Sequence, residues 1–151
     1  MTTERKLISI IIPVFNEEKN IPRIYLEIIK VWENLKDFYD YEIIFVNDGS
    51  KDDSFNEVKS ISKGDKKVKC FNFSRNFGKE IALTAGINNS HGDAAIMIDA
   101  DLQHPPELIP NFIKKWEDGA DVVIGVRDKN NGEGIIKRWG SFCFYKAMNA
   151  I

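Results

Sequence analysis

Two acidic residues with a single small residue between them, Asp99-Ala100-Asp101, directly follow the apolar run 94–98. Two carboxylates at the end of one buried strand can reach the same point in space. Hard divalent cations take oxygen ligands, and magnesium is usually held by one or two carboxylates together with substrate phosphates. The pair therefore suits a metal ion that bridges the protein and a diphosphate. The tripeptide alone also fits a strand-ending turn whose carboxylates cap the next helix.

A second polar cluster, Val46-Asn-Asp-Gly-Ser50, ends another apolar run. A carboxylate held at a strand end can accept the imino N–H of uracil or guanine, so Asp48 is a candidate for reading a nucleobase. The same residues also form an ordinary turn, in which Gly49 supplies a positive φ and a neighbouring polar side chain caps a helix. Both interpretations stay open on the residues alone.

Two further segments are chemically less specific. Pro13 has no N–H for a sheet ladder and marks the end or an edge of the first strand, and Glu17 fits the first turn of the helix that follows. In the segment 73–79, Arg75 and Lys79 are candidates for phosphate contacts, although such cations are more often simply solvated. The small residues that follow, at positions 82, 85 and 86, predict close packing of a helix on a sheet.

Alternating strands and helices position these clusters. Apolar runs predict buried strands at 7–15, 41–46, 67–73, 94–98 and 120–126. Helical periodicity and helix-start signals predict helices at 21–35, 53–62, 79–89 and 105–118. This alternation with short joints specifies an α/β sandwich with a mainly parallel sheet. Ligands of open α/β sheets bind at the carboxyl ends of the strands, where three of the polar clusters fall.

The composition describes one globular domain. The 151 residues, 43% hydrophobic and 29% charged, can bury a core but are too few for two comfortable domains. The net charge of −2 provides no basic field, so no nucleic-acid partner is expected. The two isolated cysteines, Cys70 and Cys143, favour a reducing compartment. The apolar run 7–15 is about half as long as a membrane span, and no signal peptide is recognised.

Five segments, in this order and at these intervals, resemble the family 2 glycosyltransferases of the GT-A fold, in particular the polyprenyl-phosphate hexosyltransferases. The segments are Ile11-Ile-Pro-Val-Phe-Asn-Glu17, Val46-Asn-Asp-Gly-Ser50, Ser74-Arg-Asn-Phe-Gly78, Asp99-Ala-Asp-Leu-Gln-His-Pro-Pro-Glu107 and Gly125-Val-Arg127. They cover nearly the entire chain, and no single one is specific. The resemblance implies a Rossmann-like three-layer sandwich, a nucleotide-diphosphate sugar donor, and Mg²⁺ or Mn²⁺ as cofactor.

The resemblance also implies roles for individual residues at the donor. The residues expected to hold the nucleoside are Pro13, Phe15, Glu17, Val46 and Asp48. Many relatives have Tyr in place of Phe15, so a hydroxyl contact would be missing here.

The acidic segment would hold the ribose, the diphosphate and the metal. Asp99 and Ala100 are expected on the ribose and diphosphate side, and Asp101 and Gln103 are the expected metal ligands. His104 is interpreted as a helix-start residue rather than a ligand.

The implied reaction is an inverting transfer in which charge develops on the leaving nucleotide diphosphate. Arg127 and Arg138 are expected to neutralise phosphates, and Asp101 and Arg127 are the expected catalytic residues. UDP-sugars are the favoured donors, with GDP-mannose second. A polyprenyl phosphate acceptor is already largely ionised near neutral pH, because the second pKa of a phosphate is about 6, so it needs no strong general base.

The chain departs from the family pattern at its C-terminus. Relatives continue beyond the position of Ile151, so a truncated chain is expected, with a nucleotide-sugar-binding core at 1–128 and a separate segment at 129–151. That segment is basic and aromatic, and 135–148 fits an amphipathic helix in lipid headgroups, on the cytoplasmic side of the plasma membrane. A helix packed on its own domain is the alternative.

Other functions remain open. A related glycosyltransferase could extend a cell-surface saccharide, and the fragment could bind nucleotide without turnover. A sugar-nucleotide pyrophosphorylase would need a Gly-rich basic loop where this chain has 13–17. GxGxxG and P-loop patterns are absent from the sequence, which argues against dinucleotide-binding and P-loop proteins.

Overall fold

The computed structural model describes residues 5–126 and 142–146. Its strands are β1 (Lys6–Val14), β2 (Tyr39–Asn47), β3 (Val68–Asn72), β4 (Ala94–Met97), β5 (Val122–Gly125) and β6 (Phe142–Lys146). Its helices are α1 (Ile21–Trp32), α2 (Ser54–Gly64), α3 (Lys79–Asn88) and α4 (Ile109–Glu117), with a 3-10 turn at Pro106–Leu108 before α4. The predicted alternation of strands and helices is confirmed up to β5, with ends that differ by a few residues.

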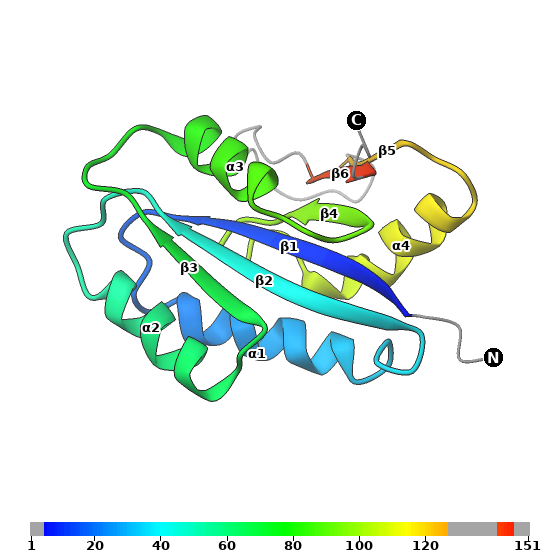
Figure 1. The fold of residues 1–151 in the computed structure, drawn as a ribbon, viewed down its shortest axis with the longest axis horizontal. Helices are drawn as coiled ribbons and strands as arrows, with labels where there is room; N and C mark the ends of the chain where they lie inside the picture. The colour runs from blue at the N-terminus through cyan, green and yellow to red at the C-terminus, as the bar shows by residue number, and fades with distance from the viewer. Residues whose placement is uncertain (1–4, 127–141, 147–151) are drawn as a thin grey trace, which may run out of the picture.

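The strands form one sheet in the order β3-β2-β1-β4-β6-β5 (Figure 1). β1 pairs in parallel with β2 and β4, and β2 pairs in parallel with β3. β6 lies antiparallel between β4 and β5. The mainly parallel sheet is confirmed, and the carboxyl ends of β1, β2 and β4 meet at one edge.

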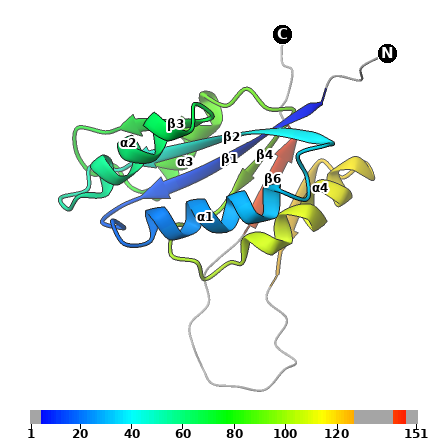
Figure 2. The same cartoon turned by 90° about the horizontal axis from the view of Figure 1, so that it is seen from below.

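Helices cover both faces of the sheet, which confirms the three-layer α/β sandwich (Figures 1 and 2). The larger core lies between the sheet and α1, α2 and α4, and two smaller clusters lie under α3. β1 shows why both faces are apolar: Ile10 belongs to the larger core, and the next residue, Ile11, packs with Leu83 and Ile87 of α3. A strand buried on both faces needs a continuous apolar run.

α3 lies very close to the sheet because it presents small residues to it. Ala82 and Gly86 are its buried residues. A Cβ built on Gly86 would lie 2.4 Å from Cγ2 of Ile11, so a larger side chain would push the helix away from β1. This confirms the close packing predicted from the small residues, and it holds the start of α3 near the carboxyl ends of the strands.

A buried polar network occupies the sheet face beyond α3. Glu42 is 5% exposed, and its carboxylate accepts hydrogen bonds from Ser9 Oγ, Lys69 Nζ and the backbone N–H of His91, each 2.6 Å long. Burial alone would raise the pKa of Glu42, but these donors outweigh it and hold the pKa below its ordinary value of 4.5. The network therefore joins β1, β2 and β3 through one carboxylate.

The helix expected over 135–148 is wrong at Phe142–Lys146, where the structure has strand β6. Ala94 to Ile96 of β4 and Val122 to Gly125 of β5 hydrogen-bond to this strand from its two sides. Aromatic residues favour strands as well as amphipathic helices, and two free sheet edges decide between them. The remainder of the expected helix, and most of segment 129–151, lie outside the described residues.

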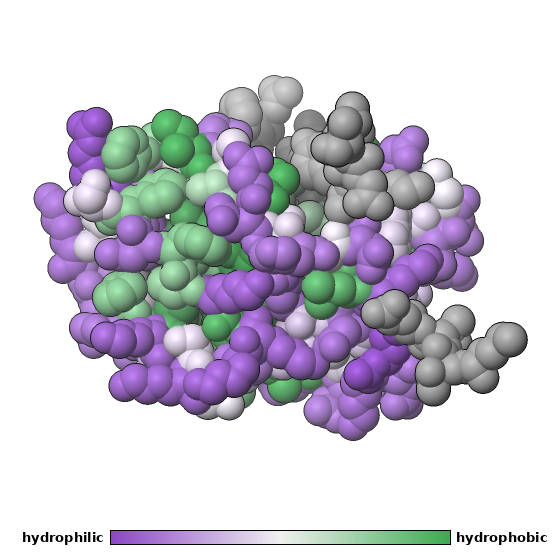
Figure 3. All heavy atoms as spheres, in the orientation of Figure 1, coloured by the Kyte–Doolittle hydropathy of each residue, from purple (hydrophilic) through white to green (hydrophobic). Residues whose placement is uncertain are grey.

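Figure 3 shows apolar groups gathered over α3 and β3, within a largely hydrophilic face. Phe77, just before α3, is 42% exposed, and Ile81, within α3, is 50% exposed. Within residues 5–126 and 142–146, the helices are all too short or too polar to cross a bilayer.

Candidate functional site

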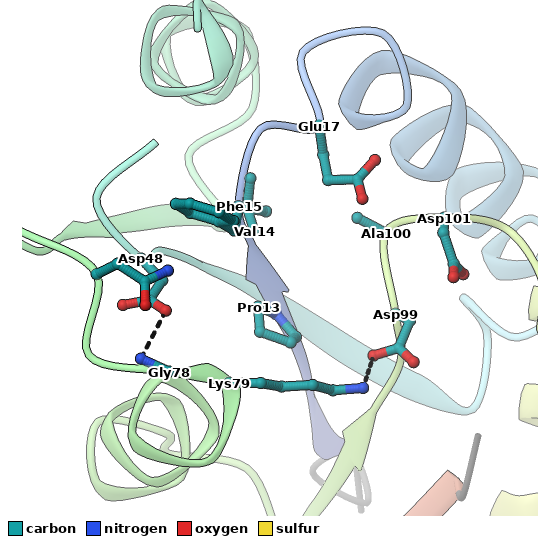
Figure 4. A pocket seen from close by; sticks show the side chains of 11 residues that line it. Pro13, Val14, Phe15, Glu17, Asp48, Gly78, Lys79, Asp99, Ala100 and Asp101 are labelled. Carbon is teal, nitrogen blue, oxygen red and sulfur yellow. Dashed lines mark hydrogen bonds and ion pairs between the residues drawn. The ribbon is translucent and has the colours of Figure 1, made fainter. Parts of the chain in front are cut away.

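A pocket of about 290 Å³ opens at the edge where β1, β2 and β4 end (Figure 4). It collects residues from four separate parts of the chain, which the parallel strands bring together. The lining residues are Pro13, Val14, Phe15, Glu17, Asp48, Asn76, Gly78, Lys79, Asp99, Ala100 and Asp101. Four of these side chains are carboxylic acids and one is a lysine, so the described lining is strongly acidic.

The Asp48 carboxylate organises one wall of the pocket. Asp48 is 3% exposed, and its Oδ1 and Oδ2 accept hydrogen bonds from the backbone N–H groups of Phe77 (2.7 Å) and Gly78 (2.9 Å). Gly49 allows this close contact, since it has φ +67° and a Cβ there would lie 2.4 Å from the carbonyl carbon of Arg75. The turn after β2 and the segment before α3 therefore form one unit.

The turn after β1 is joined to the same unit. The backbone N–H of Asn16 donates to Ser50 Oγ (2.9 Å), and Asn16 Oδ1 accepts from the N–H of Lys51 (2.8 Å). Asn16 has φ +56°, which asparagine tolerates better than most residues. The N–H of Glu17 donates to Ser54 Oγ at the start of α2 (2.9 Å). These bonds place Phe15 and Glu17 on the pocket wall before any ligand arrives.

The acidic segment after β4 forms the other wall. Ligand atoms of Asp99, Asp101 and His104 all lie within 4.8 Å of one another. Asp99 Oδ1 is 2.6 Å from Lys79 Nζ, and Asp99 Oδ2 is 4.0 Å from His104 Nδ1. Asp101 Oδ1 accepts the backbone N–H of Gln103 at 3.0 Å. The segment turns back sharply here, with φ +59° at Leu102.

This donor set fits a divalent cation. Two carboxylates and an imidazole within 4.8 Å are suitable ligands for manganese, and the carboxylates also suit magnesium. Gln103, the expected second ligand, is exposed and does not line the pocket. His104, expected as a helix-start residue rather than a ligand, lies beside the two carboxylates. Its proximity depends on the turn at Leu102, for which a leucine gives no sequence signal.

The other predicted residues fall into three groups. Seven line the one pocket: Pro13, Phe15, Glu17, Asp48, Asp99, Ala100 and Asp101. Val46 does not; its side chain is fully buried under α3 with Ile44 and Ala82. Arg127 and Arg138 lie outside the described residues.

Three lining residues, Val14, Asn76 and Gly78, are not among the site residues expected from the sequence, and Lys79 is expected there only as a weak phosphate candidate. Asn76 and Gly78 belong to one of the five segments that carry the family resemblance. The available signal was therefore the position of that segment after β3, at the same sheet edge as the acidic pair.

The strand order, the three layers and the acidic pocket at the carboxyl edge define a protein of the GT-A fold. The chain belongs to glycosyl transferase family 2, whose family model matches residues 9–150.

Relatives of this chain carry more specific names. It is 46% identical over 144 residues to a prophage bactoprenol glucosyl transferase homolog of Escherichia coli and to the bactoprenol glucosyl transferase of Shigella phage SfX. It is 45% identical over 143 residues to the uncharacterized glycosyltransferase YkcC of Bacillus subtilis. These alignments cover 95% of this chain and 46%, 47% and 44% of the respective relatives. The chain therefore spans about half the length of the curated relatives it matches.

Solved structures share the fold at lower identity. The mannosyltransferase PcManGT from Pyrobaculum calidifontis, in complex with GDP-Man and Mn²⁺, superposes with a TM-score of 0.70 at 21% identity, over 85% of this chain and 38% of that chain. TarS 1–349 of S. aureus, in complex with UDP-GlcNAc, superposes with a TM-score of 0.62 at 21% identity, over 86% and 37%.

Proposed function

We propose that this chain is the donor-binding part of an inverting, metal-dependent glycosyltransferase. It would take a hexose from a nucleotide-diphosphate sugar, with UDP-sugars favoured and GDP-mannose second. The acceptor would be a polyprenyl phosphate at the cytoplasmic face of the membrane. The names of the bactoprenol glucosyl transferases support the lipid acceptor.

The charge of the pocket is the observation that carries the proposal. Four acidic residues and one lysine line the cavity among the described residues. A diphosphate would be repelled by such a lining unless a cation came with it. A pocket that collects acids at the ligand-binding edge of a GT-A sheet therefore suits a metal–diphosphate complex better than a free anion.

In the proposed mechanism each wall has a task. The turns after β1 and β2, with Phe15, Glu17 and Asp48, orient the nucleoside so that the sugar faces the acceptor. Asp99 and Asp101, with His104 beside them, would hold the metal. With Mg²⁺ or Mn²⁺ held there, these residues would place positive charge against the departing diphosphate. Arg127 is proposed to add a further positive charge to the leaving group, and the acceptor phosphate attacks from the opposite face.

Calorimetric titration of UDP and GDP, with and without Mn²⁺, tests the donor and metal parts. We expect binding of at least one nucleotide that depends on Mn²⁺ and that Asp101→Ala weakens at least about tenfold, because a carboxylate ligand is lost. Asp118→Ala, on the exposed end of α4, is the matched control and should bind as the wild type does. Unchanged affinity in Asp101→Ala would refute the metal assignment.

The acceptor is tested by UDP release from UDP-glucose. Stimulation by undecaprenyl phosphate in detergent supports the lipid acceptor. Stimulation by an oligosaccharide and not by the lipid would refute it and favour the saccharide-extending alternative.

A further inference from the structure

Lys79 reaches across the pocket from the wall opposite the acidic segment. It is the first residue of α3, and its extended side chain passes Pro13 to place Nζ 2.6 Å from Asp99 Oδ1 (Figure 4). Its side chain is 53% exposed, and that of Asp99 is 25% exposed. Lys79 is the single cation among the described lining residues.

The ammonium group is paired with a carboxylate of the proposed metal site, at Asp99 Oδ1, while Asp99 Oδ2 lies 4.0 Å from His104 Nδ1. Asp99 belongs to the group of three residues whose ligand atoms lie within 4.8 Å of one another. A cation held by Asp99 and Asp101 would lie close to Lys79 Nζ, and two positive charges at such a distance repel each other. Lys79 therefore stabilises Asp99 when no metal is present and opposes the metal when it binds alone.

A donor diphosphate changes this balance. A lysine has a flexible four-carbon stem and binds phosphate as a point charge, so its ammonium group can leave one partner for another nearby. Lys79 also stands at the amino end of a ten-residue helix, where the helix dipole favours an anion. A diphosphate held by the metal beside Asp99 would lie within the pocket that Lys79 already lines.

We propose that Lys79 is an exchangeable counter-ion of the donor site. It pairs with Asp99 in the free protein and transfers to the donor diphosphate when the metal and the nucleotide bind together. This inference rests on the proposed function, because it needs a metal–diphosphate complex in the pocket. The Lys79–Asp99 pair weakens metal binding when no nucleotide is present, so metal and nucleotide binding depend on each other.

The exchange predicts effects of opposite sign for Lys79→Met. Without nucleotide, Mn²⁺ should bind about threefold or more tightly, because a competing positive charge is gone. With saturating Mn²⁺, UDP should bind about tenfold more weakly, because a phosphate contact is lost. Lys79→Arg keeps the charge and should retain UDP affinity within about threefold of the wild type. A residue with a purely structural role would not produce this pattern.

The experiment uses electron paramagnetic resonance of free Mn²⁺ for the metal alone and calorimetry for UDP. Lys30→Met is the matched control, since it removes another exposed ion pair, that with Glu27 on α1. Thermal melting verifies that each variant is folded. The exchange is supported if Lys79→Met binds Mn²⁺ more tightly and UDP more weakly than the wild type, while Lys30→Met changes neither affinity.

Two other outcomes overturn the exchange. Lys79→Met could match the wild type in both titrations, or it could lose affinity for Mn²⁺ and UDP together. Either result refutes the exchange and leaves the proposed function standing, provided the wild type binds UDP with Mn²⁺. If the wild type bound neither UDP nor GDP in the presence of Mn²⁺, that result would instead refute the proposed function, and the exchange with it.

Discussion

Asp48→Asn is expected to loosen the pocket wall before α3, although it changes the shape of the side chain very little. In the wild type both carboxylate oxygens accept backbone N–H groups, from Phe77 at 2.7 Å and Gly78 at 2.9 Å. An asparagine has one acceptor oxygen and one NH₂ donor. One of the two backbone N–H groups would then face another donor.

The cost follows from the burial of this contact. Asp48 is 3% exposed, so water reaches the carboxylate poorly. Hydrogen bonds to charged groups are worth about 1.5–3 kcal/mol each, and the adjoining loop is partly exposed, so we expect a loss of about 2 kcal/mol. For a domain of about 150 residues, 1 kcal/mol lowers the melting temperature by roughly 2–4 °C. Asp48→Asn should therefore melt about 4–8 °C below the wild type.

Calorimetry measures the melting temperature, and amide hydrogen exchange at Phe77 and Gly78 locates the effect. Both amides should exchange faster in Asp48→Asn, and UDP affinity should fall because Asn76 and Gly78 line the pocket. Asp118→Asn makes the same change at an exposed position and should leave all three quantities unaltered. A melting temperature within about 1 °C of the wild type, with unchanged exchange at both amides, would refute the reasoning.

Three further predictions concern the core. In Gly86→Ala the new Cβ would lie 2.4 Å from Ile11, so overpacking should cost about 1–3 kcal/mol of stability, offset by about 1 kcal/mol gained in helix propensity. Gly64→Ala is the control, because a Cβ there has nothing within 4 Å and should not destabilise the protein. Urea titration compares the free energies of unfolding of the two variants. The depressed pKa of Glu42 contributes stability that is fully present above the ordinary pKa of 4.5 and is lost as the pH falls through the lower pKa of the folded state. The difference in melting temperature between the wild type and Glu42→Gln should therefore shrink as the pH falls below the folded-state pKa. Burial raises the pKa of Cys70 to about 11, whereas a thiol in urea has a pKa of about 8.5. At pH 8, iodoacetamide should therefore label the Cys70 peptide roughly 200-fold more slowly in the folded chain than in urea; equal rates would contradict this.

The sequence predicts the layers of the fold because their signals are local. A continuous apolar run such as Ile8–Ile12 identifies a strand buried on both faces, and the period of apolar residues in α1 identifies the face that it buries. Strand ends then place the polar clusters at one sheet edge, and seven of the residues named beforehand line the one pocket described there. None of these steps needs knowledge of distant contacts.

The features that sequence reasoning missed depend on distant pairing. Phe142–Lys146 forms a strand because the edges of β4 and β5 are both available to it, and no pattern within the segment reports those edges. Val46 is excluded from the pocket by the pleat of β2, which turns its side chain toward α3. His104 lies near Asp99 because the chain turns with a positive φ at Leu102. Leucine is not a residue typical of such turns, so the sequence does not predict this one.

The pocket combines a fixed frame with an unfinished charge balance. The turns after β1 and β2 are hydrogen-bonded to each other and to the start of α3, so their conformations are set during folding and need little ordering on binding. The charges are not balanced in the same way, since four acids face one lysine among the described residues. Ligand atoms of Asp99 and Asp101 lie within 4.8 Å of each other, so a cation bound between them would offset the repulsion of their charges. Lys79 relieves part of it at Asp99, and the remainder gives a metal–nucleotide complex an advantage that neither component has alone.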